Sequence, residues 1–281
     1  MEVPIVSPTG KVRERAPGTV EASVRQLAAA VNYAYGRKDT LFPAGFAPRS
    51  PEQVSRTPSY RADVKMLAAM FRYCVEPERG PDDSDKFYAR KRLWRAQLHR
   101  FLQISVATWA RPDAAHEVST ARERDQWHSN ARALNLNQRG RAQTKKYRPI
   151  VPISDRVARL LDGTTGFYVT VVSVDRAFER MAEVLKLPGE GEGGLKLIRR
   201  SMAHLARERL GERDWIEGQI MLGHRKTSTS DIYAPFTPGY LARALAVTDG
   251  IIADIEALCP GAFEPAWSRD EDKTETKEER S

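Results

Sequence analysis

The chain has 281 residues, of which 41% are hydrophobic and 29% charged, which is the composition of an ordinary globular protein with a full core. Lysine and arginine outnumber the acidic residues by 45 to 37, so the net charge is +8 and the isoelectric point is near 9.5. The segment Ser268–Ser281 has six acidic and four basic residues, a net charge of −2, so the rest of the chain carries +10. This excess indicates a polyanionic partner, with nucleic acid as the default and a merely soluble basic protein as the alternative.

The composition also excludes several classes of protein. The two cysteines, Cys74 and Cys259, are far apart in the sequence and in apolar surroundings, which argues against a disulfide framework or a zinc site. The histidines show no metal-ligand spacing, so no metal is expected. No apolar run approaches the roughly 18–20 residues that span a bilayer. The N-terminus lacks the apolar stretch of a signal peptide. We therefore expect a cytoplasmic protein without a membrane partner.

The N-terminal part is predicted to contain one helix. Residues 1–17 are polar and contain prolines, which favours an extended or disordered lead-in. A helix is predicted from Gly18 to Gly36, because Thr19 can cap it and apolar residues recur on one face. These residues are Val20, Val24, Leu27, Ala28 and Val31. The Pro- and Ser-rich residues 37–60 are typical of a linker, so the helix is either a docking element or the remnant of a larger module.

A larger helical region begins near Thr57. Apolar periodicity predicts helices from Asp63 to Val75 and from Lys86 to Trp109, and Pro112 suits the first turn of another helix. The candidate core positions of the first two helices are Val64, Leu67, Ala68, Phe71, Val75, Leu93, Leu98, Phe101, Leu102 and Ile104.

Residues 131–153 have the pattern of strands. Leu134 and Leu136 alternate with polar residues, a turn is indicated at Gln138–Gly140, and an apolar run ends at Ile153, which together predict a short antiparallel hairpin or meander. Basic residues crowd its middle: Arg139, Arg141, Lys145, Lys146 and Arg148. Such side chains either reach into a DNA groove or form a solvated turn, and the pattern leaves both interpretations open.

Helices are predicted again at Ser154–Leu161, from Ser173 to about Leu187, from Lys196 onward and at Pro238–Leu258. The Gly-rich loop 188–194 lacks the residue order of a phosphate-binding P-loop. The fold class is therefore predicted to be mainly α with a small antiparallel β-hairpin or sheet. The predicted organisation is a lead-in at 1–17, a partial N-terminal helix and linker at 18–50, a main domain at 57–258 and a disordered charged tail at 259–281.

The residues best suited to bind or transform a substrate are cations. Arg199 lies three residues after Lys196, and Arg111 lies far upstream. Arginine binds phosphate oxygens with two parallel hydrogen bonds and stays charged, so two arginines on one phosphate would stabilise a pentacoordinate transition state without a metal. Taken singly, each arginine is equally consistent with a surface ion pair.

A histidine and a tyrosine follow these cations. Gly223 is expected to cap a helix, and His224 after it could bond a phosphate oxygen or move a proton, or simply serve as an exposed capping residue. Tyr233 could act as a nucleophile only with cations or a base nearby, because its usual pKa of about 10 makes the phenol a weak attacking group. A tyrosine that packs in the core is the alternative.

Four motifs occur in order along the chain: ATWARP, QTKKYRPIVPI, KLIRRS and LGHRKTSTSDIY. With these motifs, residues 57–258 resemble the catalytic domain of the tyrosine recombinases, or phage integrases. The predicted helix at 18–36 is similar to the last helix of the N-terminal core-binding domain of that family. The resemblance implies a site-specific DNA recombinase that cleaves and rejoins DNA through a 3′-phosphotyrosyl intermediate, with no cofactor and no metal.

The resemblance also implies a role for each matching residue. Arg111 and Arg199 would clamp the phosphate, and Tyr233 would be the nucleophile. Lys145 would protonate the leaving 5′ oxygen, although Lys146 adjoins it and the register is open. Lys196 occupies the place usually held by histidine, and His224 takes the second His/Trp position. The implied partners are double-stranded DNA at attachment sites, three further copies in a homotetramer on DNA, and accessory DNA-bending proteins.

Two alternatives to the recombinase remain open at the level of sequence. One is a relaxing activity like that of the type IB topoisomerases, which tolerate lysine at the position of Lys196. The other is a DNA-binding protein with an unused active site, because the N-terminal clamp is reduced to one helix. The helix Pro238–Leu258 either docks on a neighbouring subunit or packs within its own chain.

Overall fold

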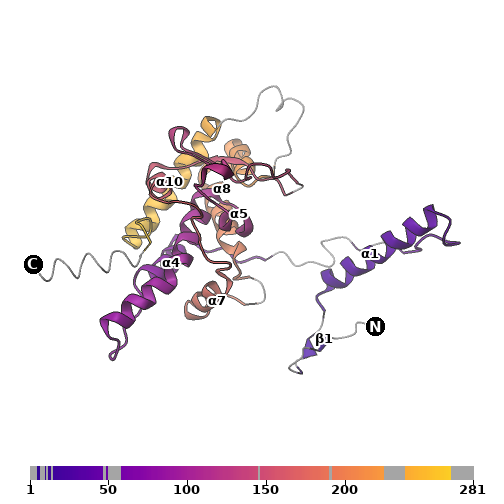
Figure 1. The fold of residues 1–281 in the computed structure, drawn as a ribbon, viewed down its shortest axis with the longest axis horizontal. Helices are drawn as coiled ribbons and strands as arrows, with labels where there is room; N and C mark the ends of the chain where they lie inside the picture. The colour runs from indigo at the N-terminus through magenta and orange to yellow at the C-terminus, as the bar shows by residue number, and fades with distance from the viewer. Residues whose placement is uncertain are drawn as a thin grey trace, which may run out of the picture. The chain divides into compact units, whose positions relative to one another are not determined.

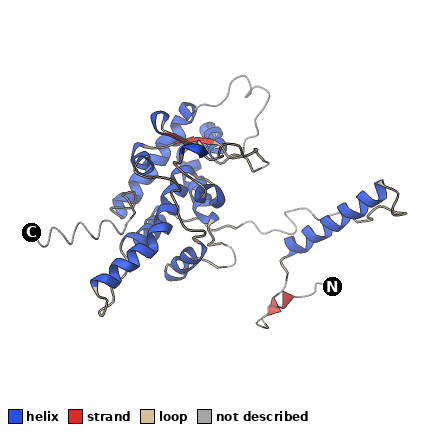
Figure 2. Ribbon diagram, viewed as in Figure 1, coloured by secondary structure: helices blue, strands red, loops and turns tan. Residues whose placement is uncertain are grey.

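Helices make up most of the structure, with one small antiparallel sheet in the larger of two units (Figures 1 and 2). The computed structural model describes residues 5–6, 10, 12–13, 15–46, 49, 58–144, 146–189, 192–224 and 238–266. The chain divides into a first unit, Met1–Ser59, and a second unit, Tyr60–Ser281.

A long helix, α1, is the main element among the described residues of the first unit. Helix α1 runs from Pro17 to Gly36, close to the predicted bounds, with Pro17 in its first turn. Strand β1 (Ile5–Val6) pairs with β2 (Val12–Arg13), so the predicted lead-in includes a short antiparallel pair. Glu21 is the buried residue of α1, where its carboxylate accepts from the backbone N–H of Arg49. The predicted apolar face stays half-exposed, and Leu27 is 62% exposed, so the described residues of this unit do not cover it.

The described residues of the second unit form helices whose starts mostly agree with the sequence, although the helix predicted from Pro238 begins at Ala242, after a 3-10 turn. They are α3 (Val64–Val75), α4 (Asp85–Thr108), α5 (Pro112–His116), α6 (Asp155–Asp162), α7 (Asp175–Val184), α8 (Lys196–Met221) and α10 (Ala242–Leu258), with short 3-10 turns η1 (Arg122–Arg124), η2 (Ser129–Ala131) and η3 (Pro238–Leu241). Asp63, Ser84 and Ser154 cap α3, α4 and α6 by accepting from backbone N–H groups of the first turn. Polar capping residues thus fix where these helices begin.

The core of the second unit forms around α4. This helix packs against α3, α8 and α10, and its C-terminal half is buried from Leu98 to Thr108 apart from Arg100. Leu98, Phe101, Leu102 and Ile104 are buried as predicted, whereas Leu93 is half-buried. The buried half of α4 ends at the turn that carries Arg111, so the best-packed part of the unit adjoins the candidate site.

The sheet confirms the predicted fold class of mainly α with a small antiparallel sheet. Strands β3 (Trp127–His128), β4 (Ala133–Asn135) and β5 (Ile150–Pro152) pair in that order, all antiparallel. Leu134 pairs with Val151 and both are fully buried, while Ile150 is exposed on the other face. The predicted hairpin corresponds to β4 and β5, and β3 is an additional strand.

The C-terminal helix packs within its own chain. Helix α10 lies against α8 and α3, and it buries Ala244, Ile251, Ile252 and Ile255. Glu217 of α8 also accepts a hydrogen bond from the backbone N–H of Ala244. The sequence left open whether this helix docks on a neighbouring subunit or packs within its own chain, and the structure shows it packed within its own chain.

The structure corrects the predicted start of the tail. The sequence assigns residues 259–266 to a disordered charged tail at 259–281, but Cys259, Ala262, Phe263 and Ala266 are all buried. The Phe263 ring lies 5.0 Å from that of Phe71, and the carbonyl of Ala262 is 2.7 Å from Nε2 of His99. These apolar residues extend the core beyond α10, while the charged residues 267–281 lie outside the described part of the chain.

Helix α8 is broken at Gly211, where φ is +69° and ψ is 172°, so two helices meet there. This break makes it possible for the end of α8 to return toward its start.

In the part of the chain that the structure describes, no helix is both long and apolar enough to cross a membrane.

Candidate active site

The corner between α4 and α5 presents the first arginine. Trp109 is fully buried and adopts a left-handed conformation with φ of +53°, which ends α4 and redirects the chain. Pro112 then opens α5, with Arg111 as the residue just before the helix. The guanidinium of Arg111 donates to the backbone carbonyl of Tyr147, 3.0 Å away. The ATWARP motif thus forms a rigid corner that holds Arg111 against the connection between β4 and β5.

Arg199 joins this corner to the end of α8. Its Nη1 donates to the carbonyl of Trp109 at 2.7 Å, and its Nη2 donates to the carbonyl of Leu222 at 2.6 Å. In a straight helix, positions 199 and 222 would be about 35 Å apart. The break at Gly211 therefore explains how one side chain near the start of α8 can contact the residue just after its end.

His224 lies beside Arg199 because of a glycine turn. Gly223 has φ of +61°, and the N–H groups of Gly223 and His224 donate to the carbonyls of Ile220 and Gln219, as at a capped helix end. The predicted glycine cap is confirmed. A Cβ added at Gly223 would lie 2.4 Å from the carbonyl oxygen of Tyr147, which is also the acceptor of Arg111. The Leu-Gly-His turn and the β4–β5 connection are therefore in direct contact.

The imidazole of His224 is an acceptor for the arginine. Its Nε2 lies 3.1 Å from Nη2 of Arg199, and since a guanidinium only donates, Nε2 must be unprotonated in this pair. Burial lowers the pKa of His224, and the positive charges of Arg199 and Arg111 lower it further. Burial likewise lowers the pKa of Arg199 to about 10, with repulsion from Arg111 as the next cause. At neutral pH the site therefore holds a neutral histidine and charged arginines.

Among the residues that the structure describes, no carboxylate contacts either arginine. Arg111 donates to a carbonyl, and Arg199 donates to two carbonyls and an imidazole. None of the ion pairs found among the described residues includes either arginine. Asp113 is near enough to raise the pKa of Arg199, but it pairs with Arg148 instead. Two positive charges held by neutral groups are suited to an external anion.

The predicted site residues have different outcomes. The structure brings Arg111, Arg199 and His224 together, and Lys196 lies exposed at the start of α8, one turn before Arg199. Lys145 and Tyr233 lie outside the described residues, so their roles stay predictions. Lys146 is exposed and its backbone is described, and the choice between the two lysines stays open.

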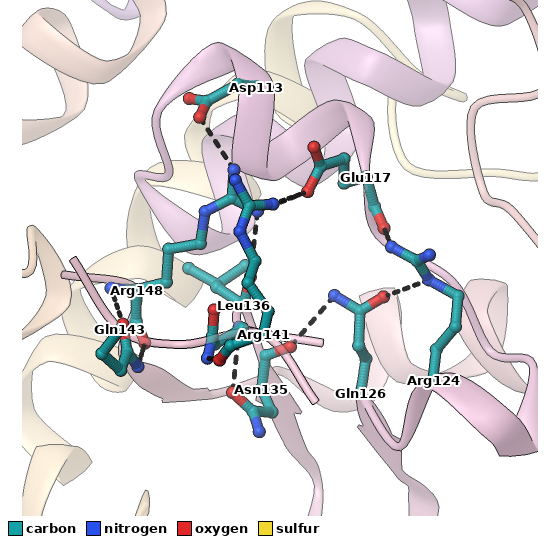
Figure 3. A network of polar contacts seen from close by, with 10 residues as sticks. Asp113, Glu117, Arg124, Gln126, Asn135, Leu136, Arg141, Gln143 and Arg148 are labelled. Carbon is teal, nitrogen blue, oxygen red and sulfur yellow. Dashed lines mark hydrogen bonds and ion pairs between the residues drawn. The ribbon is translucent and has the colours of Figure 1, made fainter. Parts of the chain in front are cut away.

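One basic residue of the hairpin differs from both sequence interpretations. Arg148 reaches neither a groove nor solvent, since it is only 6% exposed. Figure 3 shows its guanidinium beside α5, where it donates to Asp113 at 2.8 Å and to Glu117 at 2.6 Å. The exposed Arg141 contacts the same Glu117 oxygen at 2.6 Å. Asp113 and Glu117 are four residues apart after Pro112, so both carboxylates lie on one face of the helix. This spacing is the feature of the sequence that could have indicated a cation packed on that face.

The described residues contain no group of three or more His, Cys, Asp or Glu side chains arranged to hold a metal ion.

Comparison with known proteins gives a similar solved structure but no match by sequence. No protein-family model and no curated protein sequence matches the chain. Among solved structures, the chain is similar to the XerH site-specific recombinase bound to its difH substrate in a pre-cleavage complex, with 17% identity and a TM-score of 0.43. The match covers 79% of this chain and 62% of that chain. Because the TM-score is low, the site is interpreted from its own residues.

Proposed function

We propose that this chain is a DNA strand-breaking and rejoining enzyme, a site-specific recombinase of the tyrosine recombinase type with Tyr233 as its nucleophile. The observation that carries the proposal is the pair of arginines, Arg111 and Arg199, whose hydrogen bonds within the described part of the chain go to neutral acceptors. A phosphodiester is the anion that a basic protein of net charge +8 would meet on DNA.

In this proposal, Arg111 and Arg199 bind the non-bridging oxygens of the scissile phosphate. The phenolic oxygen of Tyr233 forms a bond to phosphorus and loses its proton, while the bond from phosphorus to the 5′ oxygen breaks. Negative charge grows on the phosphoryl oxygens as the phosphorus becomes pentacoordinate, and fixed guanidinium groups stabilise that charge more than they stabilise the ground state. The low polarity around Arg199 strengthens this effect, because burial is the main cause of its lowered pKa.

The remaining groups manage protons and orientation. Neutral His224 keeps Nδ1–H as a donor for a phosphate oxygen while its Nε2 accepts from Arg199. Lys145 gives a proton to the leaving 5′ oxygen, and Lys196 supplies a further cation at the start of α8. Attack by a 5′ hydroxyl from a partner strand then reverses the chemistry and releases Tyr233. The phosphotyrosyl bond retains the energy of the broken bond, so the reaction needs no nucleotide.

Covalent trapping tests the nucleophile. Purified protein is incubated with nicked duplexes, a pool that carries the DNA flanking the gene and randomised sequences, so that a short cleaved strand diffuses away and the adduct persists. We expect an adduct that survives denaturation and leaves a free 5′ hydroxyl, and we expect Tyr233→Phe to abolish it, because the nucleophilic oxygen is lost. Tyr240→Phe is the control, since Tyr240 is a half-exposed tyrosine of η3 that the proposal does not use. A covalent adduct with Tyr233→Phe would show that another residue attacks.

The same preparation separates the competing functions. Relaxation of supercoiled plasmid without recombinant products would favour the topoisomerase-like activity. Binding of DNA without any adduct would favour a DNA-binding protein with an unused active site. Assembly of four copies on one DNA, measured by light scattering of the isolated complex, would support strand exchange between two duplexes.

A further inference from the structure

A buried guanidinium connects two elements of the candidate site. Arg148 follows Tyr147 directly, and it is buried although it belongs to the most basic stretch of the hairpin. Its two carboxylate partners, Asp113 and Glu117, are on α5 and at its C-terminal end, and its Nη1 also lies 3.5 Å from the carbonyl of Leu136. Arg148 therefore ties α5 to both sides of the β4–β5 connection (Figure 3).

Arg111 and Arg148 both connect α5 to the β4–β5 connection, one from each element. Arg111 at the start of α5 donates to the carbonyl of Tyr147, and the next residue, Arg148, donates back to the carboxylates of Asp113 and Glu117. If the hairpin moved relative to α5, both sets of contacts would break together. The position of Arg111 is thus coupled to the ion pairs of Arg148.

The backbone of Arg148 also closes the segment that contains Lys145. The side-chain amide of Gln143 accepts from the N–H of Arg148 at 3.1 Å and donates to its carbonyl at 2.8 Å. Residues 144–147 lie between these two fixed ends in the sequence. The side chain and the backbone of Arg148 therefore determine together where this four-residue segment is anchored.

The charge of Arg148 costs free energy that an apolar residue would avoid. Removing a guanidinium from water is costly unless carboxylates and hydrogen bonds replace the lost hydration. Burial acts to raise the pKa of Asp113, but the charge and hydrogen bond of Arg148 outweigh it and hold that pKa below its usual value. Two directed ion pairs specify one relative position of hairpin and helix, whereas apolar contacts tolerate sliding.

From this geometry we propose that Arg148 is a positioning residue, which fixes the β4–β5 connection against α5 through its ion pairs with Asp113 and Glu117. The proposal rests on the proposed function, because it assigns Arg148 to the same cleavage site. The buried guanidinium does not touch DNA; it acts on the leaving group through the β4–β5 connection, to which the proposed function assigns the proton donor Lys145.

The experiment compares two leaving groups in single-turnover cleavage of a nicked duplex at saturating DNA. In one substrate the leaving atom is the normal 5′ oxygen, and in the other it is sulfur, which departs as a thiolate without a proton. We expect Arg148→Gln to slow cleavage of the oxygen substrate roughly 100-fold, since a displacement of about 1 Å can cost this much. The sulfur substrate should recover most of that loss, as it should for Lys145→Ala. DNA affinity should stay within roughly threefold of wild type, because the side chain is buried.

Matched variants keep the test decisive. Arg209→Gln removes an arginine that pairs with Asp254 at 2.6 Å on the α8–α10 face, and it should cleave both substrates at the wild-type rate. If Arg148→Gln does not fold, Glu117→Gln replaces it, because Glu117 is 36% exposed and its loss leaves Asp113 to pair with Arg148. Glu117→Gln should show the same recovery with sulfur, on a smaller loss.

The outcomes distinguish this inference from the function on which it rests. Wild-type protein that forms no adduct with either substrate would overturn the proposed function itself. If wild type cleaves and the folded Arg148→Gln variant cleaves the oxygen substrate as fast, the positioning role is wrong. The role is equally wrong if both substrates slow by the same factor, or if the variant loses DNA affinity and not cleavage rate.

Discussion

The pairing of His224 with Arg199 sets how the site responds to acid. The imidazole lies within hydrogen-bonding distance of one guanidinium and near a second, so a proton on Nε2 would add a third positive charge and displace the donor of Arg199. Phosphate binding would offset that charge. The contact between His224 and Arg199 therefore requires a neutral imidazole, so the stability of the folded protein depends on pH.

This dependence can be measured in the free protein. The folded pKa of His224 is lowered, so below the unfolded value of about 6.5 the unfolded chain binds a proton that the folded chain does not. The contribution to the free energy of unfolding is therefore present above pH 6.5 and decreases as the pH falls through the folded pKa. We expect urea unfolding between pH 8 and pH 5 to show a shallower loss of stability for His224→Gln than for wild type.

A matched variant tests the assignment to this histidine. His204→Gln changes an exposed histidine that pairs with Glu208 at 3.4 Å, one turn away on the surface of α8. It should keep the steeper wild-type loss of stability on acidification. Identical pH profiles for wild type and His224→Gln would contradict the lowered pKa of His224.

Single residues also show which parts of the candidate site can be predicted from the sequence. Arg111, Arg199 and His224 could be predicted because each lies in a short motif with its own chemical reason. The burial of Arg148 could not, since it depends on how α5 lies against the hairpin, and a run of basic residues has the same pattern whether it is solvated or packed. Its partners, Asp113 and Glu117, are visible only as one face of a five-residue helix and the residue that ends it.

At the scale of elements, the Leu-Gly-His turn contacts the hairpin with no space for a side chain. Gly223 has a left-handed backbone, and a Cβ added there would lie only 2.4 Å from the carbonyl oxygen of Tyr147. Either the turn or the hairpin must therefore move when a side chain is introduced. The same carbonyl accepts from Arg111, so the displacement would reach the site.

Gly223→Ala is therefore expected to lower both stability and activity. The left-handed conformation alone costs about 1–2 kcal/mol for alanine, and the contact with Tyr147 adds to it. Gly194→Ala is the control, because an added Cβ there meets nothing within 4 Å and the backbone is not left-handed. Chemical unfolding and the rate of covalent trapping check the two expectations, and a Gly223→Ala variant with wild-type values in both would contradict the close packing.

Helix starts were the elements most readily predicted. Capping residues and a proline mark the starts of α3, α4, α5 and α6, and these signals are local. Strand β3 is only two residues long, too short for alternation to reveal it. The sequence does not reveal the break at Gly211 either, because the amphipathic pattern continues on both sides and only tertiary packing turns the chain there.

At the scale of the whole molecule, the boundary of the core was harder to predict than its centre. Residues 259–266 follow the last helix and precede a charged segment, so composition alone assigns them to the tail. The structure instead places Phe263 against Phe71, and the carbonyl of Ala262 within hydrogen-bonding distance of His99 and Gln103. Burial of an aromatic ring decides where the unit ends, and that depends on packing against α3 and α4.

Truncation should locate this boundary. A chain that ends at Ala266 keeps every described core contact, so its thermal unfolding should match that of the full chain. A chain that ends at Leu258 loses Phe263 and its neighbours, and should be strongly destabilised. Phe263→Ala in the full chain isolates the ring, with an expected loss of about 3–5 kcal/mol in the free energy of unfolding. The exposed Phe87→Ala is the control, since Phe87 is 39% exposed. Equal stability of the chains ending at Leu258 and Ala266 would mean that the core ends with α10.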